Sequence, residues 1–192
     1  LVDLDPNRAE TQARRHNLNP LVTTDTAAAI RRVRPDFVVD LTVPSSHCVV
    51  TCTALRMGCP VLGEKPMAAS MVQARRMVRT AEATGRLYMV SQSRRYHPVH
   101  AGLARCLAER RLGPLTTVNC AFYIGAHFGG FRDKMEHPLI LDMAIHHFDL
   151  ARMFSRADPV AVYAHAFNPN GSWYDGNASA SCIFEMSNGL VF

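Results

Sequence analysis

Residues 36–65 read DFVVDLTVPSSHCVVTCTALRMGCPVLGEK, and this stretch decides the fold. The apolar run at 37–39 predicts a buried strand that ends near Thr42. Either serine at the start of 45–57 can cap a helix over that range, and the glycine that follows supplies a left-handed stop. A second apolar run at 60–62 then predicts another strand. A strand, a helix and a strand in this order predict a βαβ unit of a parallel sheet.

The same alternation extends over the first half of the chain. Helix starts are marked by an aspartate or serine that can accept a backbone N–H, as Asp5 does before Pro6. A glycine at 85 closes the last of these helices. The expected elements are a strand end at 1–4, helices from Pro6, at 26–34 and at 70–83, and a strand at 87–92.

The pattern changes after a helix that runs from Pro98 to about Arg111 and stops at Gly113-Pro114. Longer strands are then expected at 115–124, 159–166 and 178–186, and Asn188-Gly189 is a strong hairpin turn signal. We therefore predict an α/β fold with two domains. A Rossmann-like parallel sheet domain covers 1–113, and an α+β domain with an open, largely antiparallel sheet covers 114–192.

The composition excludes several classes of protein. With 48% hydrophobic and 19% charged residues, the 192-residue chain is typical of globular proteins. The net charge of +5 comes from scattered arginines without a basic block, so we expect no nucleic-acid partner. No apolar run approaches the roughly 20 residues of a membrane span. The six cysteines form no C-x-x-C pair, which favours free thiols and a cytoplasmic location.

Several polar residues follow the predicted strands directly. In open α/β sheets, ligands bind outside the carboxyl ends of the strands. Asp3, the turn at 42–47, Glu64-Lys65 and Arg94-Arg95 would therefore share one rim. A carboxylate at the position of Asp3 can bind the two ribose hydroxyls of a dinucleotide and disfavours a 2′-phosphate, so NAD is expected over NADP. A solvated loop aspartate is the alternative.

The segment 140–150, ILDMAIHHFDL, carries most of the chemistry. On a helix with about 100° per residue, Asp142, His146 and Asp149 fall within a narrow arc, while most other positions are apolar. Because charged groups are costly to bury without partners, a polar stripe on a buried helix indicates a site. His146 suits proton transfer near neutral pH, and Asp142 could orient it or hold a substrate hydroxyl. A satisfied core histidine is the alternative, and His147 is expected to be structural or to face the rim.

Lys65 lies between Glu64 and Pro66 at a predicted strand end. Its ammonium offers three donors and a charge that stabilises a developing alkoxide. An exposed loop lysine is the alternative.

Five motifs occur in order: Asp3, Thr42 to His47, Glu64-Lys65-Pro66, Arg94-Arg95-Tyr96 with Pro98, and Asp142 to Asp149. Together they resemble the glucose-fructose oxidoreductase, inositol dehydrogenase and MocA (Gfo/Idh/MocA) family over almost the whole chain. The resemblance implies an NAD(P)-dependent oxidoreductase that transfers a hydride between a nicotinamide and a secondary alcohol of a sugar or polyol.

The resemblance also implies residue roles. Lys65, Asp142 and His146 would be catalytic, with His146 taking the proton of the hydroxyl that Asp142 holds. The same three residues and Tyr96 would bind substrate, and no metal is expected. A homodimer or homotetramer would form through the second-domain sheet. The cofactor-binding residues would be Asp3, Thr42, Pro44, His47, Glu64, Lys65 and Arg95.

The chain departs from the family pattern at three places. The first strand with its Gly-rich phosphate turn and the later strands of the second sheet are absent, so we expect both ends to be truncated and this stretch alone to be inactive. Glu136-His137-Pro138 and Ala144 stand where the family usually has glycines. A differently shaped substrate pocket is therefore expected, and the substrate itself stays open.

Two other functions remain possible at this point. A metal-dependent sugar isomerase or hydrolase could use Asp142, His146 and either His137 or Asp149 as ligands. A non-catalytic member of the family could keep the fold and bind NAD as a sensor or scaffold.

Overall fold

The computed structural model describes all 192 residues, and they divide into two compact units, 1–91 and 92–192. The first contains a three-stranded parallel sheet and the second a two-stranded antiparallel sheet, as the predicted α/β class requires. Helix α5 (Pro98–Ala108) belongs to the second of these units, where it packs against helix α6 (Ile145–Ser155).

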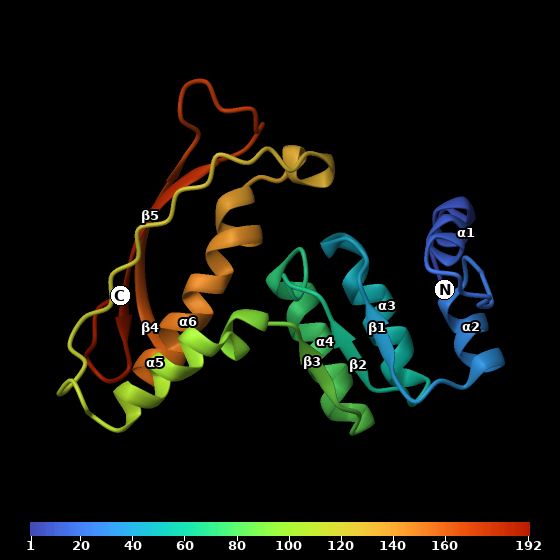
Figure 1. Ribbon diagram of the computed structural model, residues 1–192, viewed down its shortest axis with the longest axis horizontal. Coiled ribbons are helices and arrows are strands. Elements are labelled where there is room, and N and C mark those ends of the chain that lie inside the picture. Colours follow the sequence, from blue (N-terminus) through green and yellow to red (C-terminus); the bar gives the residue numbers. More distant parts are fainter. The chain divides into compact units, whose positions relative to one another are not determined.

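Helices and short strands alternate in the first unit (Figure 1). Val2 forms an isolated parallel bridge with Thr23 and is not part of the three-stranded sheet. The elements are α1 (Pro6–Arg15), α2 (Thr26–Val33), β1 (Val38–Asp40), α3 (Pro44–Arg56), β2 (Val61–Gly63), α4 (Met71–Thr84) and β3 (Tyr88–Val90).

The register of the parallel sheet positions the candidate site residues of this unit. The strands lie in the order β1-β2-β3, with Asp40 beside Gly63 and Gly63 beside Val90. The three carboxyl ends therefore lie at one edge. The turn after β1 and the Glu64-Lys65 pair after β2 leave the sheet at that edge, as predicted.

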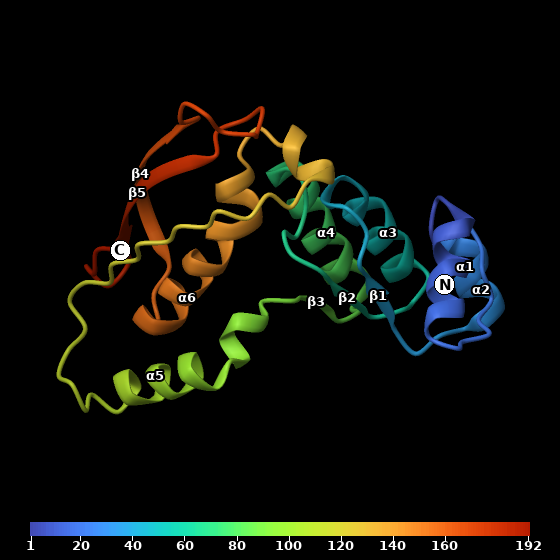
Figure 2. The same ribbon diagram turned by 45° about the horizontal axis from the view of Figure 1, so that its top comes forward.

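The core of the first unit lies between the sheet and its helices. Leu55 of α3 is fully buried and packs with Ile30 of α2 and Val61 of β2. A second cluster joins α3 to α4 through Cys52 and Met77. Helices α3 and α4 lie side by side in both views (Figure 1; Figure 2). Apolar packing of α3 against its neighbours thus fixes the direction in which its first turn points.

Local capping explains most helix boundaries. Asp5 accepts a hydrogen bond from the backbone of the first turn of α1, and Asp25 and Ser70 do the same for α2 and α4. Gly85 closes α4 in the left-handed conformation. The predicted serine cap of α3 is wrong: Pro44 occupies the first helical turn, and the helix begins without a side-chain cap.

The second unit builds a helix and a hairpin-like sheet from distant segments. Strand β4 (Pro159–Phe167) pairs with β5 (Ser179–Met186), and α6 packs on this sheet through Phe148 and Phe184. The other elements are the 3-10 helices η1 (Ser93–Tyr96) and η2 (Gly130–Lys134) and the π-helix η3 (Leu139–Ala144), which continues into α6.

One turn prediction and one strand prediction for this unit had opposite outcomes. The Asn188-Gly189 turn is confirmed, because the backbones of Phe184 and Phe192 exchange hydrogen bonds across it. The strand predicted at 115–124 is wrong, since only Thr117 forms an isolated bridge there. The alternating apolar residues of that segment contact other elements, as Phe122 does with His147, without strand pairing. None of the helices combines the length and the apolar content that crossing a membrane requires.

Candidate active site

The carboxyl edge of the parallel sheet holds Glu64 and Lys65. The backbone N–H of Glu64 donates to the carbonyl of Asp40, which ties the two strand ends together. The Glu64 carboxylate turns back and accepts the backbone N–H of Lys65 at 2.9 Å. The Lys65–Pro66 peptide is cis, and both Glu64 and Lys65 are partly buried. The backbone of the lysine is thus held by the strand that precedes it.

A buried carboxylate organises the turn after β1. Asp40 accepts hydrogen bonds from the backbone and the hydroxyl of Thr42, at 3.1 and 2.6 Å, and from the hydroxyl of Thr51 at 3.1 Å. His47 Nδ1 lies 3.3 Å from Oδ2, the oxygen that also accepts from Thr51. Burial disfavours the charged carboxylate, but the hydrogen bonds from His47 and Thr42 outweigh it and hold the pKa of Asp40 below its usual range.

This network separates the predicted cofactor residues of the turn into two groups. Thr42 is exposed, whereas Pro44 and His47 are buried. His47 Nε2 has no hydrogen-bond partner, which is uncommon for a buried polar atom. The turn is therefore held from below by Asp40 and His47, with Thr42 on its surface.

The other predicted binding residues have defined partners within their own units. The Asp3 carboxylate accepts the backbone N–H of Asp5 at 2.9 Å, directly after the Val2 bridge. Arg95 forms a two-pronged ion pair with Asp149, both contacts at 2.7 Å, and Tyr96 is exposed. The guanidinium of Arg95 thus fixes η1 to α6, and its cofactor role stays a prediction.

Asp142 and His146 are the buried ionisable residues of the helix at 139–155. They are exposed by only 4% and 8%. The first part of this helix is a π-helix, so the angle of about 100° per residue assumed for the stripe does not apply to 139–144. A π-helical turn frequently accompanies a functional site, and here it carries the carboxylate.

Arg132 is the partner of Asp142 that the sequence interpretation missed. Its Nε donates to Asp142 Oδ2 at 2.7 Å. The guanidinium carbon lies 4.6 Å from the ring centre of Phe131 and 5.6 Å from that of Phe128. The only sequence signal was an arginine that follows two phenylalanines and lies ten positions before Asp142. The pair has to be seen in three dimensions.

The Arg132–Asp142 pair lines a cavity of about 280 Å³ within the second unit. Its walls come from the extended segment 124–128, the η2 and η3 helices, and the loop at 169–174 with Trp173 and Tyr174. Arg132 and Asp142 are the only charged residues among those that line it. Aromatic walls around a few fixed polar groups are typical of small-molecule sites.

The loop that forms one wall is fastened to the segment before η3. The backbone N–H of Asn177 donates to the carbonyl of Glu136 at 2.8 Å, and that of Asp175 donates to Asp133 at 3.1 Å. Gly176 lies between these contacts. A Cβ at this position would overlap the carbonyl oxygens of Met135 and Glu136. Only glycine permits this approach, which holds Trp173 and Tyr174 in place.

His147 points to a different partner. Its Nε2 lies 3.1 Å from Arg94 Nη1, and its ring packs against Phe122. Burial lowers the pKa of His147, and the nearby charge of Arg94 lowers it further. The neutral imidazole therefore accepts from Arg94, a structural role as expected for this residue.

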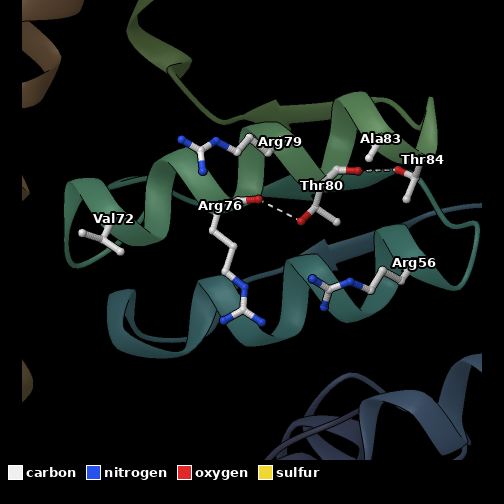
Figure 3. A pocket seen from close by; sticks show the side chains of 7 residues that line it. All are labelled: Arg56, Val72, Arg76, Arg79, Thr80, Ala83 and Thr84. Carbon is white, nitrogen blue, oxygen red and sulfur yellow. Dashed lines mark hydrogen bonds between the residues drawn. The ribbon is translucent and has the colours of Figure 1, made fainter.

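A larger hollow of about 450 Å³ lies on the first unit between α3 and α4 (Figure 3). Arg56, Arg76 and Arg79 line it. The hydroxyls of Thr80 and Thr84 donate to carbonyls of their own helix. None of the predicted site residues lines this hollow, so its size does not make it the candidate site.

Two of the side chains that the metal-site alternative would use as ligands have other partners. The carboxylate of Asp149 is engaged by Arg95, and His137 Nδ1 lies 3.4 Å from the amide of Asn177. No group of three His, Cys, Asp or Glu side chains is arranged to hold an ion.

Comparison with known proteins agrees with this geometry. The family described as "Oxidoreductase family, NAD-binding Rossmann fold" matches residues 1–92, and "GFO/IDH/MocA C-terminal domain" matches residues 100–192. An inositol 2-dehydrogenase of Saccharopolyspora erythraea is 32% identical over 73% of the chain. The chain belongs to the Gfo/Idh/MocA family. Another member, a 1,5-anhydro-D-fructose reductase of Ensifer adhaerens, is 32% identical over 67% of the chain.

Solved structures of Gfo/Idh/MocA-like proteins share the fold. An inositol dehydrogenase homologue from Azotobacter vinelandii, complexed with NADH and myo-inositol, covers 98% of the chain with a TM-score of 0.86 at 19% identity. An Agrobacterium radiobacter oxidoreductase with NAD⁺, L-tartaric acid and magnesium also has a TM-score of 0.86, at 24% identity and 99% coverage. The chain spans 53% and 56% of these two proteins, and 41% and 40% of the two relatives named above.

Asp40→Asn tests whether the buried carboxylate holds the turn. We expect the free energy of unfolding at pH 7 to fall by about 1–3 kcal/mol, because the amide cannot satisfy all the donors. The pKa of Asp40 is lowered on folding, so its contribution is present above the ordinary value of 3.8 and is lost as the pH falls through the folded value. Urea unfolding at pH 7 and pH 3 should show the difference shrinking in acid. The exposed Asp36→Asn is the control, and equal stability of Asp40→Asn and the unmodified chain at pH 7 would contradict the assignment.

Gly176→Ala tests the fastening of the cavity wall. The added methyl group should push the loop away from Met135 and Glu136 and destabilise the second unit by about 1–3 kcal/mol. Trp173 is the only tryptophan of the chain, so its fluorescence spectrum reports the displacement directly. Gly125→Ala is the matched control, because a Cβ there meets nothing within 4 Å. Unchanged Trp173 fluorescence in Gly176→Ala would show that the loop is not held in this way.

Proposed function

We propose that the protein containing this chain is an NAD-dependent dehydrogenase that transfers a hydride between a secondary alcohol of a sugar or polyol and a nicotinamide. The observation that carries the proposal is the pair Asp142 and His146. Both residues are buried on one helix of this chain, and Asp142 lines an aromatic cavity. The chain itself belongs to a family of NAD-binding oxidoreductases. The relatives named inositol 2-dehydrogenase and 1,5-anhydro-D-fructose reductase support a polyhydroxylated substrate.

The proposed roles follow from the chemistry of three side chains. His146 takes the proton of the reacting hydroxyl, because an imidazole can exchange protons near neutral pH. Asp142 accepts a hydrogen bond from a substrate hydroxyl and orients it. Lys65 donates to the reacting oxygen and stabilises its developing negative charge.

The carboxyl edge of the first unit fits a dinucleotide. Thr42 is exposed on a turn held by buried groups, and His47 beneath it keeps an unpartnered ring nitrogen. In this proposal the Asp3 carboxylate binds ribose hydroxyls, and Pro44 and Glu64 add further contacts from the first unit. Arg95, a residue of the second unit, is also proposed to bind the cofactor. When bound, NAD supplies the hydride acceptor. The family's NAD-binding fold supports this assignment.

The location and assembly of the protein are further parts of the proposal. All six cysteines are free and three are buried, which supports a reducing compartment such as the cytoplasm. Tyr163 and Ile183 are neighbours across the β4–β5 sheet and are 73% and 56% exposed. Such an apolar sheet face supports assembly into a homodimer or homotetramer.

His146→Ala and Lys65→Ala test the catalytic roles in an active protein that contains this chain. His146→Ala should lower kcat by about 10²- to 10⁴-fold with little change in NAD affinity, because only the proton acceptor is removed. Lys65→Ala should lower kcat and also weaken NAD binding, because the lysine contacts both cofactor and reacting oxygen. Steady-state kinetics and NADH fluorescence titration measure the two effects.

The control for this pair is His147→Gln, which keeps an acceptor for Arg94 on the same helix. It should retain near-native kcat. In the unmodified enzyme, kcat/KM should rise through a pKa in the histidine range, and this limb should vanish in His146→Ala. Near-native turnover of His146→Ala with an unaltered pH limb would make the histidine structural and refute its role.

Asp3 is expected to set the choice of cofactor. Its carboxylate binds the ribose diol and repels a 2′-phosphate, so kcat/KM should be higher with NAD than with NADP. Asp3→Asn should narrow that ratio, whereas Asp5→Asn, which changes only a helix cap, should leave it unchanged. A clear NADP preference of the unmodified enzyme would overturn the role of Asp3.

A further inference from the structure

The Arg132–Asp142 pair combines a donor and an acceptor at one wall of the cavity. Arg132 uses Nε to donate to Asp142, which leaves its two Nη groups, with four N–H bonds, for other acceptors. The Asp142 carboxylate can only accept hydrogen bonds, through two oxygens that each carry lone pairs. Both residues line the cavity. The pair can therefore donate to one ligand oxygen and accept from a second one beside it.

The position of the guanidinium is well defined. The rings of Phe131 and Phe128 lie against it, and the contact with Asp142 fixes its rotation about the side-chain axis. A cation held in this way loses little freedom when a ligand binds. The Arg132 side chain is 30% exposed, so it is accessible from the cavity rather than enclosed in the core.

The charge of the cavity wall selects the kind of ligand. Arg132 contributes one positive charge and Asp142 one negative charge, and no other charged residue lines the cavity. A neutral ligand leaves this balance intact. A ligand carboxylate would bring a second negative charge close to Asp142, which disfavours its binding.

We propose that Arg132 determines substrate specificity. With Asp142 it binds two adjacent hydroxyls of a neutral polyol, the arginine donating to one oxygen and the carboxylate accepting the proton of the other, and it discriminates against sugar acids. This inference rests on the proposed function, because it assigns the cavity as the substrate site. The inference goes beyond the proposed function because it names the residue that discriminates between substrates and states that negatively charged substrates are excluded.

The single tryptophan permits a direct test without cofactor. Trp173 lines the cavity, so its fluorescence should respond when a ligand enters. The probes are D-glucitol and D-gluconate, which share a six-carbon polyhydroxy chain and differ in a terminal carboxylate, together with myo-inositol. We expect the two neutral polyols to bind at least about tenfold more tightly than D-gluconate. Equal or tighter binding of D-gluconate, or no saturable binding of either polyol, would overturn the proposal.

Variants of the Arg132–Asp142 pair distinguish a role of Arg132 in substrate specificity from a purely structural role. Arg132→Gln should weaken polyol binding by about tenfold or more, and Arg132→Lys should recover only part of it, because lysine keeps the charge but lacks the planar fork. Asp142→Asn makes the cavity net positive and should shift the binding ratio towards D-gluconate. Arg152→Gln is the control, since Arg152 pairs with Asp158 and does not line the cavity. A glucitol-to-gluconate ratio that is the same in Arg132→Gln, Asp142→Asn and the unmodified chain would refute the proposal.

The outcome is separable from that of the proposed function. If the polyols bind more tightly than D-gluconate by the expected ratio but a dehydrogenase assay shows no hydride transfer, the dehydrogenase assignment fails. The role of Arg132 in ligand specificity then stands. If hydride transfer occurs and Arg132→Gln leaves KM unchanged for neutral polyols, the dehydrogenase assignment stands and the role of Arg132 fails.

Discussion

Each unit of this protein is organised around a carboxylate that is almost completely removed from water. A buried charge destabilises a fold unless donors surround it, so the chain has to bring donors to Asp40 in the first unit and to Asp142 in the second. The segments that supply those donors are the segments that form the candidate site. The cost of burying a charge thereby becomes a constraint on where the functional residues lie.

The two carboxylates recruit their donors in different ways. Asp40 is satisfied by Thr42, His47 and Thr51, all within eleven residues along the chain, so the turn and the first half of α3 are fixed locally. Asp142 pairs with Arg132, which lies on a separate helix, and the chain between the two residues is irregular. The first arrangement builds a rigid edge suited to a cofactor of constant shape. The second arrangement ties the cavity wall to a segment that is separate from the helix carrying Asp142.

The cavity also depends on a close backbone approach that involves no functional side chain. Gly176 allows the loop with Trp173 to lie directly on the backbone before η3, so the aromatic wall and the Arg132–Asp142 pair share one support. The carbonyl of Glu136 anchors this loop by accepting the backbone N–H of Asn177. Glu136 is one of the residues at which the sequence predicts a departure from the family pattern.

The sequence by itself determined the parts of the fold that depend on near neighbours. The caps at Asp5 and Asp25, the stop at Gly85 and the turn at Asn188-Gly189 are interactions between residues a few positions apart, so local pattern was sufficient. The order of strands and helices then implied the shared edge of the parallel sheet, and the buried polar stripe pointed to Asp142 and His146.

Tertiary structure alone decided the rest. The pairing of Arg132 with Asp142, the approach at Gly176 and the engagement of Arg95 by Asp149 each join separate segments of the chain. The π-helical turn under Asp142 and the missing strand at 115–124 depend on packing against such distant partners. Periodicity and capping describe only what a residue does with its close neighbours, and a buried charge takes its partner from whichever segment the fold brings beside it.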